Sequence, residues 1–333
     1  MNVYKIIIIV ISSVFLGLNV LAYFTLFLPL IRKTKQSVPK QKNDLPPLNK
    51  PFSDSIFNAI KFLEEHEKER ITQISLDKHK LAADLYTVEN AKGTVILCHG
   101  FKGYAYTDCG VAAEHFVKSG YNALVIYQRS HYESEGKNIC FGIKERYDCL
   151  GWIKMMNERF GETLPLYLYG VSMGAATVLM TTGFDLPKNI KCVIADCGFT
   201  SPYEIIKSCA KAYFMLKISQ FIIYVFAGYN IKQYSTLKAM EKNEIPIIFF
   251  HGLKDSFVPP YMTEQNYNAC KAKKEMYLIP EAKHTQSLYL NPEFYWSKID
   301  AFMQKSTDGT FEKEMKEANE QEKQNFQENT VVN

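Results

Sequence analysis

The sequence predicts an α/β protein built on an eight-stranded, mostly parallel, doubly wound sheet. Short apolar runs alternate with stretches of helical periodicity between residues 52 and 306, which is typical of right-handed crossovers between parallel strands. A strand, a glycine-rich turn and an apolar helix follow one another in residues 164–180. The length of 333 residues suits one domain of about 250 to 270 residues with appended segments.

Eight apolar segments are predicted to be strands. They cover residues 71–76, 81–88, 94–98, 122–127, 166–169, 190–195, 246–250 and 275–279. The first two are expected to be antiparallel and to lie at an edge of the sheet. In the seventh segment Pro246 takes the first position, where a missing N–H group is tolerated.

Helices are predicted between these strands. The first begins at Ser53 or Asp54, either of which can cap it, and places Ile56, Ile60 and Leu63 on one face. The others cover residues 110–118, 141–160, 173–180, 260–272 and 292–305.

The N-terminal region is predicted to be a membrane anchor. Residues 6–31 carry no charge, and as a helix they would be about 39 Å long against a hydrocarbon core of about 30 Å. We therefore expect residues 1–31 to be a transmembrane helix of a single-pass membrane protein, followed by a proline-containing linker over residues 32–51. A cleaved signal peptide is the alternative. Basic residues that follow the apolar run favour a main domain on the cytoplasmic face.

The rest of the chain divides into a main domain and a tail. Residues 52–306 are predicted to form the α/β domain, and residues 307–333 a charged polar tail. Between the sixth and seventh strands, residues 201–244 exceed a single crossover helix and are predicted to form a small helical cap. The apolar run at residues 221–227 either packs the cap on the body or forms an apolar face for an acyl chain or a lipid.

Composition excludes several classes of function. The net charge is only +4, from 39 basic and 35 acidic residues, so no nucleic-acid partner is predicted. The eight cysteines show no metal-ligand spacing, and free buried thiols are expected. No His/Cys/Asp cluster and no phosphate-binding loop is recognisable, so neither a metal nor a cofactor is predicted.

Residues 166–174 predict the reactive centre. A strand leads into Gly170, Ser172 and Gly174, and a helix follows at once. This Gly-x-Ser-x-Gly context is a nucleophile elbow, which holds the serine in a strained conformation at a helix N-terminus. Ser172 is therefore the predicted nucleophile.

A serine nucleophile needs a base, and the base needs an orienting carboxylate. Asp255 follows the seventh strand and His284 follows the eighth, in the chain order Ser, acid, His. We predict that Ser172 attacks, that His284 transfers the proton and that Asp255 orients His284. Asp196 and Glu281 are alternative acids.

Two backbone N–H groups are predicted to form the oxyanion hole. Met173 follows the nucleophile directly, and Phe101 lies in the loop after the third strand. His99, His131 and His251 are expected to have structural roles.

Several motifs occur in a recognisable order over about residues 70–305. They are His99-Gly-Phe, Arg129-Ser-His, Gly170-Val-Ser-Met-Gly174, Asp196-Cys-Gly-Phe-Thr-Ser-Pro202, His251-Gly-Leu-Lys-Asp-Ser-Phe-Val-Pro259 and His284. The sequence resembles the α/β-hydrolase superfamily, most of all the bacterial, often membrane-anchored hydrolases described as serine-aminopeptidase-like or acyl-hydrolase-like. The resemblance implies hydrolysis of a carboxylic ester, a thioester or a peptide, without a cofactor.

The sequence thus predicts a serine hydrolase that acts on the ester or related acyl bond of a small-molecule, lipid or peptide substrate. An aminopeptidase is the alternative, and it would need acidic groups for the substrate amine, such as Glu133, Glu135 or Asp196. A hydrolase fold that binds a partner without catalysis is the alternative from another class.

Overall fold

The computed structural model describes residues 2–22, 38–209, 213–311 and 313–314. At its centre lies a sheet with the strand order β1-β2-β4-β3-β5-β6-β7-β8. The strands are β1 (Glu69–Ile74), β2 (Lys80–Tyr86), β3 (Thr94–Cys98), β4 (Asn122–Ile126), β5 (Leu166–Val171), β6 (Ile190–Asp196), β7 (Ile247–Gly252) and β8 (Lys274–Ile279). β2 pairs antiparallel with β1 and β4, and all other pairs are parallel. The predicted eight-stranded, mostly parallel sheet is confirmed, including its antiparallel edge.

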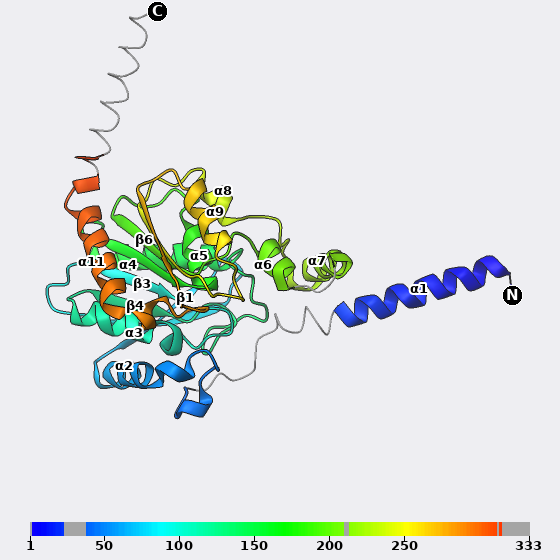
Figure 1. Cartoon of the computed structure of the whole chain (residues 1–333), viewed down its shortest axis with the longest axis horizontal. Helices are drawn as coiled ribbons and strands as arrows, with labels where there is room; N and C mark the ends of the chain where they lie inside the picture. The colour runs from blue at the N-terminus through cyan, green and yellow to red at the C-terminus, as the bar shows by residue number, and fades with distance from the viewer. Residues whose placement is uncertain (1, 23–37, 210–212, 312, 315–333) are drawn as a thin grey trace, which may run out of the picture.

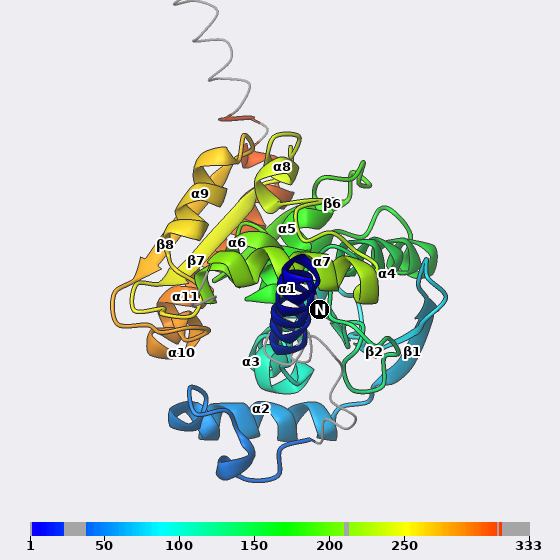
Figure 2. The same ribbon diagram turned by 90° about the vertical axis from the view of Figure 1, so that its right-hand side faces the viewer.

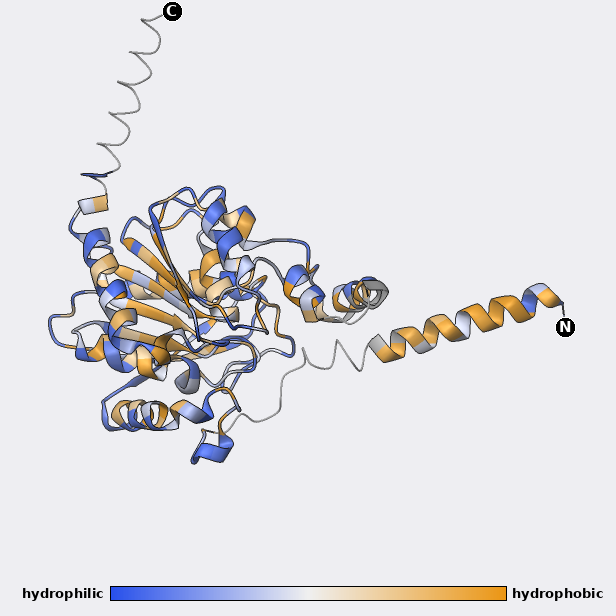
Figure 3. Ribbon diagram, viewed as in Figure 1, coloured by the Kyte–Doolittle hydropathy of each residue, from blue (hydrophilic) through white to orange (hydrophobic). Residues whose placement is uncertain are grey.

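Helices cover both faces of the sheet (Figures 1 and 2). On one face α3 and α11 bury apolar side chains such as Phe116 and Phe302, and α2 packs against α3, with Ile56 in the same apolar cluster. On the other face α4, α5 and α8 bury side chains such as Trp152 and Val178. These helices are α2 (Ser53–Glu65), α3 (Ala105–Lys118), α4 (Glu145–Phe160), α5 (Met173–Thr181), α8 (Thr236–Met240) and α11 (Pro292–Thr307). The strands between them are mostly apolar, as the colouring in Figure 3 shows, because both faces of the sheet are covered.

Two helix starts differ from the predicted ones. α3 begins at Ala105, one turn before the predicted start, and α4 begins at Glu145, one turn after it. The α4 start has a clear cause: the carboxylate of Glu145 accepts hydrogen bonds from the N–H groups of Cys140, at 2.7 Å, and Gly142, at 2.9 Å. These bonds hold the preceding residues in a turn and leave them outside the helix.

The segment between β6 and β7 contributes two further helices beside α8. They are α6 (Pro202–Cys209) and α7 (Tyr213–Ala227). Ile205 of α6 and Ile223 of α7 belong to an apolar cluster that also contains Phe141 and Met173. The inner faces of α6 and α7 therefore pack next to the residue that follows Ser172.

The N-terminal helix α1 (Val3–Ala22) extends from the body beside α7. Nowhere in the described parts of the chain does a helix combine the length and the apolarity that crossing a bilayer requires. The predicted transmembrane anchor over residues 1–31 is therefore not supported: α1 ends at Ala22, and residues 23–31 lie outside the described residues. Residues 32–37 of the predicted linker and residues 312 and 315–333 of the predicted tail also lie outside the described residues.

Candidate active site

The turn after β5 holds Ser172 in a strained backbone conformation. Its φ is 56° and its ψ is −116°, and α5 begins at the next residue. The glycines on either side allow a close approach of neighbouring chain segments. A Cβ on Gly170 would lie 2.4 Å from the carbonyl oxygen of Gly174, and one on Gly174 would lie 1.9 Å from that of Cys98. Both glycines are therefore required for the elbow.

The structure brings Ser172, His284 and Asp255 together in one hydrogen-bonded chain. The Oγ hydroxyl of Ser172 lies 2.9 Å from His284 Nε2 and can donate to it. On the other side of the ring, Nδ1–H donates to Asp255 Oδ2 at 2.7 Å. The His284 side chain is 11% exposed, so it is reachable from outside while its tautomer is set by the carboxylate.

Asp255 is held as a carboxylate by four donors. Besides His284, Oδ2 accepts from His251 Nε2 at 3.2 Å, and Oδ1 accepts from the N–H groups of Phe257 and Val258 at 2.8 and 2.9 Å. Burial alone would raise the pKa of Asp255, but the hydrogen bonds from His251 and His284, together with the charge of His284, outweigh it and hold the pKa well below its usual range.

His251 has a contact that the sequence did not predict. Its Nδ1 lies 2.6 Å from the hydroxyl of Thr263, and its Nε2 lies 2.9 Å from the carbonyl oxygen of Val258. A neutral ring that accepts at Nδ1 and donates at Nε2 satisfies both contacts and the bond to Asp255. The position of His251 at the end of β7, four residues before Asp255, is the feature of the sequence from which this contact could have been predicted.

The two alternative acids have other partners. Asp196 accepts from the hydroxyls of Ser287, at 2.9 Å, and Tyr295, at 3.2 Å, and burial raises its pKa. Glu281 lies at the surface in an ion pair with Lys254. Among the three carboxylates, only Asp255 is hydrogen-bonded to His284 within the described residues.

The predicted oxyanion donors belong to two segments close to Ser172. Met173 is the first residue of α5, and the first N–H groups of a helix have no intrahelical acceptor. Phe101 lies in the tight turn from Gly100 to Gly103, and its N–H has no acceptor among the described residues. Its ring stacks on Phe141 with centroids 5.0 Å apart.

One group of possible metal ligands occurs in the described part of the chain: Cys197, Asp255 and His284, with ligand atoms within 4.8 Å of one another. Two of these residues belong to the serine site, and the facing atoms of His284 and Asp255 already share a hydrogen bond. Burial raises the pKa of Cys197 well above its ordinary value, so the thiol keeps its proton. This group fits a serine site better than a metal centre.

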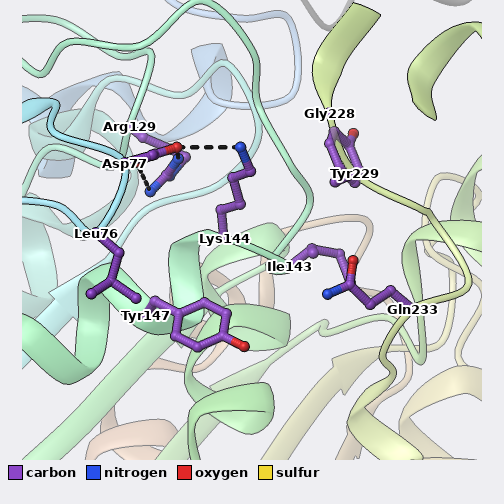
Figure 4. Close-up of a pocket in the computed structure, with 9 residues that line it drawn as sticks. All are labelled: Leu76, Asp77, Arg129, Ile143, Lys144, Tyr147, Gly228, Tyr229 and Gln233. Carbon is purple, nitrogen blue, oxygen red and sulfur yellow. Dashed lines mark hydrogen bonds and ion pairs between the residues drawn. The ribbon is translucent and has the colours of Figure 1, made fainter. Parts of the chain in front are cut away.

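The structure also contains a cavity of about 250 Å³ (Figure 4). It is lined by Leu76, Asp77, Arg129, Ile143, Lys144, Tyr147, Gly228, Tyr229 and Gln233. Its charged groups are paired: Asp77 lies 2.8 Å from Arg129 and 3.2 Å from Lys144, and Arg129 also lies 2.6 Å from Asp148. None of the predicted catalytic residues lines it.

An eight-stranded sheet of this order, with a serine on the strained turn between a strand and a helix, defines an α/β-hydrolase. The model of the prolyl oligopeptidase family matches residues 140–310, more than half of the 333-residue chain. The chain belongs to that family, and the superfamily predicted from its motifs is confirmed.

Similar proteins agree with this placement. An uncharacterized protein of Bacillus subtilis, YqkD, is 26% identical over 65% of this chain and 73% of its own length. An uncharacterized membrane protein of Saccharomyces cerevisiae is 28% identical over 71% of this chain and 79% of its own length. Among solved structures, the esterase Pf2001 of Pyrococcus furiosus has a TM-score of 0.62 at 19% identity, covering 83% of this chain and 98% of that one. The acylaminoacyl peptidase of Pyrococcus horikoshii has a TM-score of 0.56 at 15% identity, and the match covers 75% of this chain and 43% of that one.

The contacts of the three carboxylates generate a prediction. Asp255→Asn should lower kcat by about 10⁴-fold, because an amide cannot hold the His284 tautomer and does not stabilise the imidazolium. Asp196→Asn should lower kcat by less than about tenfold, because its side chain bonds to Ser287 and Tyr295 instead. Steady-state hydrolysis of p-nitrophenyl butyrate by the full chain measures both. A larger loss from Asp196→Asn would make Asp196 the acid.

Proposed function

We propose that this protein is a serine hydrolase that cleaves a carboxylic ester or a related acyl bond. The carrying observation is the hydrogen-bonded chain from Ser172 Oγ through His284, at 2.9 Å, to Asp255, at 2.7 Å. These distances lie within the reach that proton transfer from a nucleophile to its base requires.

The proposed reaction has two halves. Ser172 Oγ attacks the acyl carbon while its proton moves to His284 Nε2, and the oxyanion accepts hydrogen bonds from the N–H groups of Phe101 and Met173. The intermediate collapses to an acyl-enzyme, and the leaving group departs with the proton from His284. Water then attacks the acyl-enzyme with His284 as base, and Ser172 regains its proton when the acid is released.

A peptidase is the second candidate, because the family that matches the chain is named for prolyl oligopeptidase and one structural neighbour is an acylaminoacyl peptidase. For an aminopeptidase, however, the three predicted amine-binding acids have other partners. Glu133 pairs with Arg70, Glu135 accepts from the N–H of Lys80 at 2.8 Å, and Asp196 is buried. These contacts favour an ester or another acyl bond over a free N-terminus.

The serine mechanism predicts covalent labelling. The full chain should react with a fluorophosphonate probe at Ser172, and Ser172→Ala should abolish labelling. His284→Ala should slow it by at least about 10³-fold, because the serine loses its base. In-gel fluorescence and mass spectrometry of the labelled peptide measure this. Circular dichroism of the variants serves as the folding control.

No labelling of the folded wild-type chain would contradict the proposal and would favour a hydrolase fold that binds a partner without catalysis. Labelling that persists in Ser172→Ala would place the reactive residue elsewhere.

The surroundings of the site support an apolar acyl group. Phe101 and Met173, which carry the proposed oxyanion donors, contact the apolar cluster formed with α6 and α7. The outer face of α7 is apolar as well: Phe221, Tyr224 and Val225 are 61%, 62% and 52% exposed. We infer that α7 contributes an apolar face for the acyl chain.

This inference predicts a dependence on chain length. Phe221→Ser should lower kcat/KM for a decanoate ester by about tenfold relative to an acetate ester, because less apolar surface contacts the long chain. Leu76→Ser, at a residue that is 80% exposed in the turn after β1, is the matched control and should not change the ratio. Equal losses on both esters in Phe221→Ser would contradict the inference.

We also propose that α1 associates the protein with a membrane. Most of its apolar side chains are exposed, for example Ile8 and Ile11, both 62%, and Figure 3 shows the apolar character along the helix. The yeast relative named as a membrane protein supports this proposal.

Flotation with phosphatidylcholine vesicles tests the membrane proposal. The full chain should float with the vesicles, and a variant with Ile8→Ser and Ile11→Ser should remain in the dense fraction, because the apolar face of α1 is interrupted. Leu76→Ser should float like the wild type. Equal flotation of the α1 variant, or none of the wild type, would overturn the proposal.

A further inference from the structure

Two side chains accept hydrogen bonds from the backbone of the turn that carries Phe101. Within it, the N–H of Gly103 donates to the carbonyl oxygen of Gly100 at 3.2 Å, and Lys102 has a positive φ of 53°. The N–H of Lys102 donates to His131 Nε2 at 3.0 Å, and the N–H of Gly100 donates to Asp108 Oδ2 at 2.9 Å. The N–H groups on either side of Phe101 are thus used to hold the turn.

Asp108 fits closely against this turn. It lies in the first turn of α3, eight residues after Gly100. A Cβ on Gly103 would lie 1.9 Å from Asp108 Oδ2, and one on Gly100 would lie 3.1 Å from the same atom. The two glycines therefore leave room for one carboxylate oxygen beneath the turn. The same Cβ on Gly100 would lie 3.4 Å from the Cβ of Ser172, so Gly100 is close to both Asp108 and the nucleophile.

We propose that Asp108 is a positioning residue for the reaction, which fixes the Gly100–Gly103 turn so that the Phe101 N–H points at the oxyanion. The proposal rests on the serine hydrolase function proposed above. Oxyanion stabilisation depends on donors that are already in place before charge develops. A turn of four residues with two glycines has many other conformations, and the bond from Gly100 to Asp108 selects one of them.

The surroundings of Asp108 raise the pKa of its carboxyl group. With Thr107, Tyr169, Asp196 and Tyr289, among others, it lines a small pocket. Burial raises the pKa of Asp108 to about 6, although the Gly100 N–H and the charge of His284 act in the opposite direction. Above this pH the carboxylate makes a charge-assisted bond to Gly100, which is stronger than a neutral one.

The experiment compares variants of the full chain on p-nitrophenyl butyrate. Asp108→Leu should lower kcat by about 100-fold with KM changed by less than about twofold, because the lost interaction acts on the transition state. Asp108→Asn keeps an acceptor oxygen of the same size and should recover most of kcat. Thr107→Val is the matched control, since the Thr107 hydroxyl lines the same cavity and has no hydrogen-bond partner in the described structure. It should be indistinguishable from the wild type.

An inhibitor provides a readout that a merely structural role would not change. An alkyl trifluoromethyl ketone forms a tetrahedral oxyanion on the serine, whereas the corresponding methyl ketone binds without efficient addition. Asp108→Leu should weaken the binding of the trifluoromethyl ketone by about the same factor by which it lowers kcat. It should leave the binding of the methyl ketone nearly unchanged. If the binding of both ketones weakens equally, or if Asp108→Leu has the kcat of the wild type, the proposed positioning role is wrong.

A pH profile tests the proposal even where Asp108→Leu does not fold. The kcat ratio of wild type to Asp108→Asn should be largest above about pH 6 and should narrow as the pH falls through that value, because the protonated carboxyl and the amide are both neutral. The other titratable groups near Asp108 are the same in both proteins and largely cancel in the ratio; they are His284, Cys109, Tyr169, Asp196 and Tyr289. A ratio that does not change with pH would overturn the proposal.

Failure of the proposed function itself is distinguishable. In that case the wild-type chain neither turns over the ester nor reacts with the fluorophosphonate, and the role of Asp108 falls with it. If only the Asp108 inference is wrong, the wild type is active, Ser172→Ala is inactive and the Asp108 variants behave like the wild type.

Discussion

The close approach of three chain segments at the elbow is the constraint on which the site depends. Gly174 lies directly against the carbonyl oxygen of Cys98 at the end of β3, and Gly170 lies against the first turn of α5. The strained Ser172 persists only because β3, β5 and α5 are held this tightly. Parallel pairing of β3 with β5 places the loop after β3, with Phe101, on the same edge of the sheet. The nucleophile and its predicted oxyanion donors are therefore consequences of one packing arrangement.

A second arrangement supplies the base and the acid. β6, β7 and β8 follow β5 in order across the sheet, so the loops that carry Asp255 and His284 open on the edge where Ser172 lies. The carboxylate of Asp255 is buried, but four donors compensate its desolvation. The same logic applies to Asp108, whose partner is a backbone N–H of the oxyanion turn. Carboxylates that accept hydrogen bonds from ring or backbone N–H groups thus support both halves of the site.

Much of this could be predicted from the sequence, because local patterns were sufficient. The alternation of strands and helices determined the sheet, and the Gly-x-Ser-x-Gly turn between strand and helix determined the place of Ser172. Chain order and the ends of successive strands led to Asp255 and His284, since parallel strands end at one edge. The start of α4 could not be predicted in this way. It depends on the hydrogen bonds of the Glu145 side chain to the preceding backbone, and these leave no trace in the apolar pattern.

The sequence by itself determined the fold class and the three residues that the structure brings together at Ser172. Only the tertiary structure decided which carboxylate orients His284. Asp196 and Asp255 both lie at the ends of strands, but the carboxylate of Asp196 accepts hydrogen bonds from Ser287 and Tyr295, which belong to later helices. The tertiary structure also revealed His251 beside Asp255 and Asp108 beneath the oxyanion turn. The physical reason is that a carboxylate acquires its role from the donors around it, and these come from elements that are distant in the chain.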